Sequence, residues 1–200
     1  GVRVVKNTRV ERALVEQEAP DALIMATGGK PRWPVVEGAE TGHLVDVWQV
    51  LKGEANVGAS VVVADWRCDW VGMGMAEKLA RDGCRVRLAV AGLVPGQSIP
   101  QYVRDHWAGT LHKLGVEVIP YARLYGVDGE TAYFQHIASG EPLILEGVDT
   151  IVLAQGQEQV EELADALRGL DLELHQIGDC LSPRSAEEAV LEGLRAAMAL

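Results

Sequence analysis

The stretch SVVVADWRCDWVGMGMAEKLARDGCRVRLAV, residues 60–90, decides the fold class. Ser60–Ala64 is apolar and β-branched, which is typical of a strand buried on both faces of a parallel sheet. The apolar periodicity of Gly72–Arg81 predicts a helix that stops at Gly83, and Arg85–Val90 predicts a second strand. A strand, a glycine-containing turn, a helix and a strand within about thirty residues have the size of a βαβ unit. We therefore predict an α/β chain with a Rossmann-like parallel sheet.

The pattern extends on both sides of this unit. Ala22–Ala26 and Asp149–Ala154 are apolar runs that end at glycines, as buried strands that meet tight turns do. Lys30–Glu40 is rich in Pro and Gly and predicts a crossover between subdomains. Asp128-Gly129 predicts a hairpin turn. The remaining predicted strands are Val2–Val5, Arg9–Val15, Val116–Ile119, Ala122–Val127, Thr131–Ile137 and Leu174–Ile177, and the remaining predicted helices are Val45–Leu51, Gln101–Leu114 and Glu161–Arg168.

The last predicted element is a helix near the end of the chain. It begins at Ser182-Pro183, since Ser is a good N-cap and Pro suits a first helical turn, or at Ser185 if Ser185 and Glu188 form a capping box. We expect the helix to pack on a sheet and to point its positive end at the Gly178-Asp179 turn. The stripe that would make this contact contains Ala186, Ala189, Val190, Leu194, Ala197 and Met198.

Composition excludes several classes of function. The 200 residues carry a formal net charge of −11, which argues against nucleic acid as the main partner. No apolar run reaches the length of a membrane span and no signal peptide precedes the first predicted strand, so we expect a cytoplasmic protein without a membrane partner. The chain begins at Gly1 rather than Met, which suggests an excised domain, a proteolytic fragment or a processed product.

Cysteine and histidine spacing offers no metal site. Cys68, Cys84 and Cys180 are odd in number and widely spaced, as free thiols in a reducing compartment are. His106 and His112 are six residues apart and do not share a helix face well. We therefore expect no metal ligands and no catalytic residue within this chain.

The turn that follows the central strand departs from the dinucleotide-binding pattern. A Gly-x-Gly-x-x-Gly is expected there, and Gly72 matches only its third glycine. Asp65 and Asp69 would place negative charge where a pyrophosphate sits, and Trp66 and Trp70 would fill the space that the missing glycines leave open.

The adenosine-ribose position of this predicted site is also altered. The end of the next strand, Val90-Ala91-Gly92, has no Asp or Glu for NAD and no Arg for NADP. Gly156, after the strand Asp149–Ala154, would border the same site. The sequence therefore argues against tight NAD(P) binding at this degenerate site of Asp65, Gly72 and Gly156.

Two strand-end turns are better candidates for ligand contact. Ala26-Thr27-Gly28-Gly29 offers small residues that let the backbone approach a nucleotide, or it is a crossover turn without a ligand. Asp179 could accept hydrogen bonds from ribose or ribityl hydroxyls, or it could cap a turn. Arg184 could pair with a phosphate or be a solvated surface charge.

The order of these features resembles the trimethylamine dehydrogenase and 2,4-dienoyl-CoA reductase family (NADH:flavin oxidoreductases with an old-yellow-enzyme-like barrel), and specifically its C-terminal FAD/NAD(P)-binding-type region. The resemblance implies a partial FAD- or ADP-type domain at residues 1–40. It implies an inserted NAD(P)-type Rossmann domain at 41–148, and a closing strand with a return to the first domain at 149–200. It also implies that Asp179, which matches an Asp of the family, contacts the flavin ribityl chain. Pro183-Arg184 matches a Pro-Arg that commonly follows this motif in the family.

The resemblance further implies a flavin-dependent oxidoreductase acting on an amine or an enone, with this chain inactive alone. FAD or ADP would meet an incomplete site here, whereas FMN and a 4Fe-4S centre would belong upstream. The expected partners are an adenine nucleotide or flavin, the parent chain's barrel and, in a homo-oligomer, a second copy. Two rival hypotheses remain: an active NAD(P)H-binding reductase domain and a non-catalytic packing or interaction module.

Overall fold

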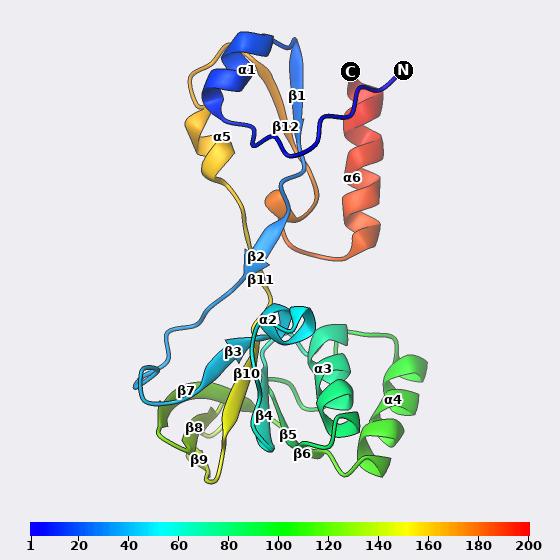
Figure 1. Ribbon diagram of the computed structural model, residues 1–200. Helices are drawn as coiled ribbons and strands as arrows, with labels where there is room; N and C mark the ends of the chain where they lie inside the picture. The colour runs from blue at the N-terminus through cyan, green and yellow to red at the C-terminus, as the bar shows by residue number, and fades with distance from the viewer. The chain divides into compact units, whose positions relative to one another are not determined.

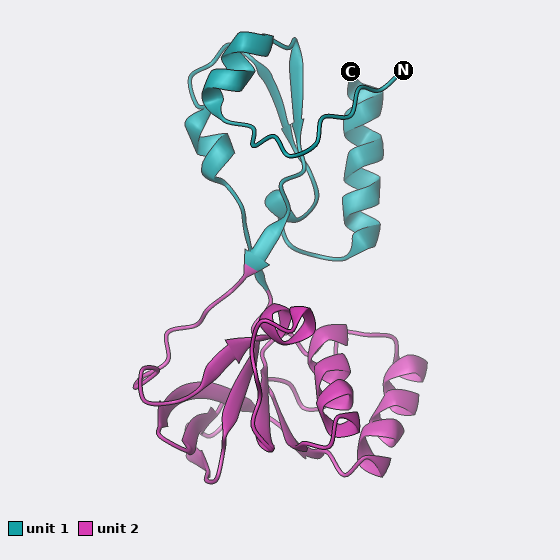
Figure 2. Ribbon diagram, in the orientation of Figure 1, with its two compact units in different colours: residues 1–30, 157–200 teal, residues 31–156 magenta.

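The computed structural model describes residues 1–200, and the chain divides into two compact units (Figure 2). Unit 1 contains residues 1–30 and 157–200, and unit 2 contains residues 31–156. Unit 2 therefore interrupts unit 1 along the chain. The chain passes from unit 1 to unit 2 between residues 30 and 31, and it returns to unit 1 between residues 156 and 157. The sequence predicted these boundaries at 40/41 and 148/149, so the first lies ten residues earlier and the second eight residues later. Which ligand type each domain serves stays a prediction.

Unit 2 is built on a five-stranded parallel sheet with strand order β3-β10-β4-β5-β6 (Figure 1). Every residue of β4 is buried, which explains why its sequence is continuously apolar rather than alternating. The fold class is thus confirmed as α/β with a Rossmann-like parallel sheet. The strands are β3 (Leu44–Asp46), β4 (Ser60–Asp65), β5 (Arg85–Val90), β6 (Glu117–Ile119) and β10 (Thr150–Ala154).

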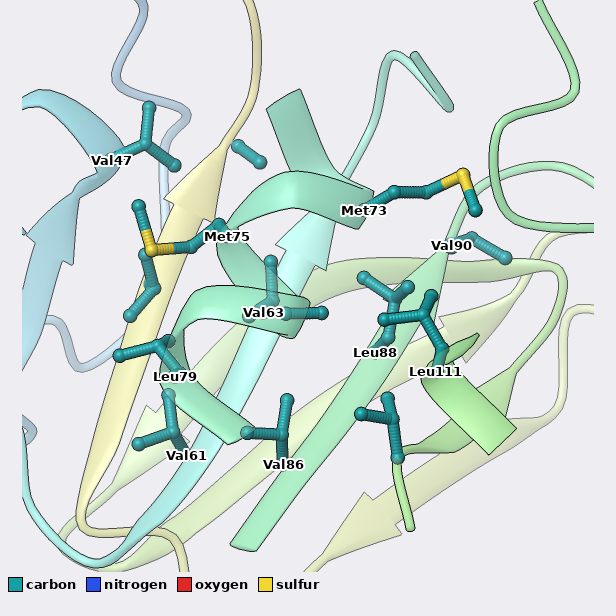
Figure 3. Packing of buried hydrophobic residues seen from close by; sticks show 14 of the residues in the cluster. Val47, Val61, Val63, Met73, Met75, Leu79, Val86, Leu88, Val90 and Leu111 are labelled. Atoms are coloured by element: carbon teal, nitrogen blue, oxygen red, sulfur yellow. The ribbon is translucent and has the colours of Figure 1, made fainter. Parts of the chain in front are cut away.

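Three helices belong to the sheet of unit 2, namely α2 (Val47–Lys52), α3 (Trp70–Arg81) and α4 (Gln101–Lys113). Helix α3 begins two residues before its predicted start because the Asp69 carboxylate caps it, accepting the N–H of Val71 at 2.9 Å. Figure 3 shows the core on this side, where α3 and α4 bury side chains against alternate residues of β4 and β5. Prominent members are Val61, Val63, Met73, Met75, Leu79, Val86, Leu88, Val90 and Leu111.

An antiparallel sheet supplies the second core of unit 2. It consists of β7 (Ala122–Asp128), β8 (Thr131–His136) and β9 (Pro142–Leu145). The predicted hairpin at Asp128-Gly129 is confirmed, with Gly129 at a φ of +54°. Strand β9 was not predicted from the sequence. The cluster joins these strands to the central-sheet residues that α3 does not cover, among them Val62, Ala64, Ile151 and Leu153.

Unit 1 contains two short strand pairs and three helices. Strand β1 (Ala22–Met25) pairs in parallel with β12 (Glu173–Gln176), and β2 (Gly29–Pro31) pairs with β11 (Gln157–Gln159). The helices are α1 (Arg12–Glu18), α5 (Glu162–Ala166) and α6 (Ala186–Ala199), and a 3-10 turn covers Gly178–Cys180. The buried core is small and consists of Val15, Met25, Ala164, Leu167 and Cys180. No helix of either unit combines the length and the apolar character that a membrane crossing requires.

The predictions for the first fifteen residues were wrong. Val2–Val5 forms no strand, and Val2 is 91% exposed because no neighbouring strand pairs with it. Arg9–Val15 overlaps helix α1 rather than a strand. The alternation of Arg and Val was misleading, because Arg12 and Glu16 form a helical i,i+4 ion pair at 2.7 Å and only Val15 is buried.

Helix α6 begins at the second of its two predicted starts. Ser185 is the N-cap and forms a capping box with Glu188, so Ser182-Pro183 lies outside the helix. The expectation that the apolar stripe packs on a sheet was wrong. Val190, Leu194 and Met198 are exposed, and the face turned inward contains the smaller or polar Ala189, Glu192, Gly193 and Ala196.

Candidate functional site

A cleft in unit 1 gathers most of the residues predicted for an FAD- or ADP-type site. Strands β1 and β12 run in parallel with Met25 opposite Gln176, so the turns that follow them leave the same edge. The N–H of Ile177 donates to the Met25 carbonyl at 3.0 Å and holds these turns together. The resulting cavity of about 360 Å³ is lined by Ala26, Gly28, Ile177, Gly178, Asp179, Arg184, Ser185, Ala186 and Ala189.

Three predicted residues of this site do not line the cleft. The Thr27 hydroxyl donates to the Val160 carbonyl at 3.1 Å. Gly29 lies in β2, where a side chain would crowd the Glu158 carbonyl, so strand pairing accounts for this glycine. Pro183 lies in the loop before α6.

Gly178 brings its backbone next to helix α6 within the cleft. Its φ of +66° favours glycine, and a Cβ there would contact Ala189 at 3.4 Å. Its N–H donates to Glu192 Oε2 at 2.7 Å, and Glu192 also accepts from the Arg184 guanidinium. The backbone donor and the cation that would meet a phosphate are therefore both held by one carboxylate of α6.

Asp179 lies on the 3-10 turn that follows β12. Its carboxylate receives one long hydrogen bond, from the Arg184 N–H at 3.4 Å, so most of its acceptor capacity is free. The side chain also lines the cavity, where sugar hydroxyls could donate to it. The geometry thus accommodates both the turn-capping and the ligand-binding interpretation of Asp179.

The degenerate NAD(P)-type turn of unit 2 is organised around Asp65. Only 1% of this residue is exposed, so its carboxyl group is buried beneath the turn rather than open to solvent. Oδ1 accepts the N–H of Cys68 at 2.9 Å, and Oδ2 has no hydrogen-bond partner. Burial raises the pKa of Asp65 to about 7, and the negative charge of Asp69 adds to this shift.

The third glycine of a dinucleotide motif lacks a side chain so that a helix can approach a strand closely. Gly72 stands at that position, but here the absent side chain leaves room for a carboxyl group of the chain itself. A Cβ at Gly72 would overlap the Asp65 carboxyl group. Asp69 meanwhile accepts the N–H of Val71, one of the free N–H groups in the first turn of α3, as its N-cap. The chain's own carboxylates thus use the space and one of the donors that a pyrophosphate would need.

Trp66 and Trp70 were both expected in the space that the two missing glycines leave open, but they lie in different surroundings. Trp70 begins α3 and faces α4, with its ring centroid 6.0 Å from that of Trp107. Trp66 is 41% exposed and lines a separate hollow. Gly156 has a φ of +84°, and its Cα faces the aliphatic part of Arg67, not an open site.

The adenosine-ribose position at the end of β5 has no acidic residue, as its sequence indicates, but an arginine that was not predicted lies near it. Gly92 donates its N–H to Cys68 Sγ at 3.1 Å, and no acidic residue follows the strand. A hollow of about 600 Å³ lies here, however, and it includes Arg104 of α4 together with Gln97 and Tyr121. Arg104 pairs with Asp105 at 3.2 Å.

No family model matches this chain, but known proteins with oxidoreductase names are similar to it. It is 24% identical over 230 aligned positions to N,N-dimethylglycine/sarcosine dehydrogenase of Chromohalobacter salexigens, covering 94% of this chain and 33% of that protein. It is 27% identical over 231 positions to the multifunctional alkene reductase/demethylase OYE of Caballeronia cordobensis, covering 100% and 34%. The solved histamine dehydrogenase of Rhizobium sp. 4-9 matches with a TM-score of 0.87 at 18% identity, covering 96% of this chain and 32% of that one.

These relatives fit the trimethylamine dehydrogenase-like family that the order of the sequence motifs resembles. The chain spans about a third of the length of the relatives described above. Their names describe a demethylase, a reductase and dehydrogenases, so the trimethylamine dehydrogenase-like relatives are oxidoreductases. Both units fall within the aligned part, because the alignments cover nearly all of this chain.

Two residues that border these sites were not predicted from the sequence. Glu192 was hidden within the apolar run of α6, and a lone acidic residue between Leu191 and Gly193 was the available signal. Arg104 belongs to helix α4 and lines the hollow at the end of β5, and nothing in the local sequence of β5 indicates it.

Proposed function

We propose that this chain is the C-terminal nucleotide-binding region of a multidomain FMN- and FAD-dependent NADH:flavin-type oxidoreductase that acts on an amine or an enone. The chain alone is inactive, because FMN, the iron–sulfur centre and the reacting groups belong to the rest of the parent protein. The observation that carries the proposal is the convergence of the Ala26–Gly28 turn and the Gly178-Asp179 turn on one cleft.

The residues of the unit 1 cleft fit part of an FAD or ADP molecule. Gly28 has open space where a side chain would be, which suits a close approach by a nucleotide. Asp179 would accept hydrogen bonds from ribose or ribityl hydroxyls. Arg184 would pair with a phosphate once it separates from Glu192, so the acidic side chain competes with the anion.

The exposed apolar stripe of α6 supports our proposal that other parts of the parent protein pack against unit 1. Val190, Leu194 and Met198 place apolar side chains on one face of a helix with nothing to cover them. Such a face is typical of an interaction surface. In our proposal the parent chain, including its barrel, covers this face.

Nicotinamide binding is the less favoured alternative. Asp65 occupies the turn and Asp69 binds the Val71 N–H in the first turn of α3, and both weaken a pyrophosphate site. Arg104 at the end of β5 is the one feature that favours an NAD(P)H-binding domain.

Isothermal titration calorimetry of the chain with ADP, FAD and NADH tests the proposal. We expect heat from ADP and FAD, at least tenfold weaker binding in Asp179→Asn, and no heat from NADH. Asp171→Asn, which changes an exposed aspartate of the same unit, is the matched control. Heat from NADH alone, or ADP binding that Asp179→Asn leaves unchanged, would contradict the assignment.

A further inference from the structure

The antiparallel sheet of unit 2 has a pocket on its outer face, away from the core that it shares with the parallel sheet. The pocket has a volume of about 460 Å³, within the range of about 300–1,000 Å³ that small-molecule sites occupy. Its lining comes from β7, β8, the turn after β8, the start of β9 and the segment before β3. No residue from the turns after β4, β5 or β10 contributes, so this pocket is separate from the nucleotide-type edge of the parallel sheet.

A β-bulge in β7 shapes the pocket. The register of β7 against β8 shifts between Leu124 and Gly126, which makes Tyr125 an extra residue of β7. Leu124 and Val127 are both buried in the inner core, so the two residues between them, Tyr125 and Gly126, belong to the outer face. Gly126 in turn pairs with Tyr133. The bulge therefore places one tyrosine beside the strand partner of another.

Gly126 forms part of the floor between these tyrosines. A Cβ at this position would lie 3.0 Å from the Glu37 carbonyl oxygen and 3.2 Å from the Glu37 Cβ, so the Glu37 side chain starts on the same face. The backbone on both sides is fixed, because Glu37 donates its N–H to the Tyr125 carbonyl at 3.0 Å and accepts the N–H of Val127 at 2.8 Å. The pocket is therefore preformed, which lowers the entropic cost of binding.

The pocket is negatively charged. Glu37 is the one charged residue in its lining, and the Glu37 carboxylate forms no ion pair. Arg123 lies on the same sheet face but donates to Gln135 Oε1 at 2.7 Å instead. The net charge of −11 adds a field that favours a cation over an anion.

The remaining lining is aromatic and apolar rather than rich in hydrogen-bonding groups. Tyr125, Tyr133 and Pro142 border the pocket, and Tyr125 is more than half exposed. Both ends of the Gln135 amide are engaged, since its Nε2 donates to the Gly140 carbonyl at 3.3 Å. Aromatic ring faces beside a carboxylate attract organic cations, whereas a hydrated metal ion would require several more oxygen ligands.

We propose that this pocket binds a small organic cation of the alkylammonium type, without changing it chemically. The methyl or methylene groups of the cation contact the faces of Tyr125 and Tyr133, and Glu37 balances the charge. A neutral ligand of the same shape would make the aromatic contacts but would leave the Glu37 carboxylate without a counter-ion.

An NMR titration of the whole chain with choline and with 3,3-dimethylbutan-1-ol tests the proposal. The alcohol is a neutral isostere of choline in which carbon replaces the charged nitrogen. We expect choline to shift the amide signals of Gly126 and Tyr133 with a millimolar Kd, and the alcohol to bind at least tenfold more weakly. Sodium chloride at matched ionic strength is the control for salt effects.

Matched variants assign the contacts. Glu37→Gln and Tyr125→Leu should each weaken choline binding about fivefold, because each removes one attraction for the cation. Glu40→Gln, an exposed glutamate of the same segment, and Tyr102→Leu, an exposed tyrosine of α4, should leave the affinity unchanged.

Three results would overturn the proposal. They are equal binding of choline and the alcohol, an absence of shifts up to about 100 mM choline, and shifts that both Glu37→Gln and Tyr125→Leu leave unchanged. The amide spectrum of each variant without ligand establishes that a loss of binding is not a loss of fold. The proposed function does not depend on any of these results, because its ligands and its variants belong to unit 1.

Discussion

Asp65 is the buried carboxyl group around which the turn after β4 is built. Its carboxyl group lies against Gly72, accepts one N–H from Cys68 and leaves Oδ2 without a partner. A buried carboxyl with so little hydrogen bonding favours its neutral form, which explains why the pKa rises to about 7.

We predict that Asp65→Asn removes a pH dependence of folding. Because the folded pKa lies above the unfolded value of 3.8, the native state holds a proton that the unfolded state releases between about pH 4 and pH 7. The wild-type free energy of unfolding should therefore fall as pH rises through this window, by on the order of 4 kcal/mol. Urea unfolding at pH 5 and pH 8 measures the effect.

The control for this prediction is Asp82→Asn, an exposed aspartate of the same unit. Arg67 and Asp69 also act on Asp65 and remain in every variant, so the difference between wild type and Asp65→Asn isolates the buried group. Equal slopes with pH in wild type and Asp65→Asn would show that Asp65 titrates normally.

Glu192 gives the second residue-level prediction. In our proposal an ADP phosphate competes with this carboxylate for the Gly178 N–H and for Arg184. Glu192→Gln should therefore tighten ADP binding by about tenfold in calorimetry, since the competing charge is gone. Glu187→Gln, an exposed residue in the first turn of the same helix, should have no effect. Weaker binding in Glu192→Gln would mean that Glu192 organises the cleft rather than obstructing it.

At the scale of elements, α6 presents apolar side chains to solvent. Replacing Leu194 and Met198 with Gln should reduce self-association of the chain and binding of a hydrophobic dye. The free energy of unfolding should change by less than about 1 kcal/mol, because Met198 is 78% exposed and little burial is lost.

Sedimentation velocity and dye fluorescence measure this prediction, with Glu187→Gln and Arg195→Gln as controls on the same helix. A large loss of stability in the double variant would instead indicate that the stripe packs within the chain. Unchanged self-association would mean that another surface drives it.

The elements show which parts of the fold local sequence can predict. Strands β4 and β5 and helix α3 were predicted to within two residues, because buried runs and 3.6-residue periodicity are local signals. Helix α1 was mistaken for a strand, since a short alternating segment fits both periods. The uncovered face of α6, the Glu192–Arg184 pair and the burial of Asp65 depend on tertiary neighbours, which no window of sequence contains.

At the scale of the whole molecule, the two units differ in how much they bury. The core of unit 1 has five buried residues, whereas two larger clusters stabilise unit 2. We predict that amides of β1 and β12 exchange with solvent deuterium faster than those of β4, β5 and β10. ADP should slow exchange only in unit 1, because a ligand stabilises the unit that binds it. Uniform protection across both units would contradict this two-part behaviour.

The pairing of β2 with β11, together with the Arg32–Gly156 hydrogen bond, brings the entry and the exit of unit 2 next to each other. A module whose two ends are neighbours can be removed, duplicated or exchanged without rethreading its host. A short linker from Lys30 to Gln157 would yield unit 1 alone, and residues 31–156 could be produced as an independent protein. In evolutionary terms, such a cassette can lose its original ligand and acquire another while the host remains under selection for its own.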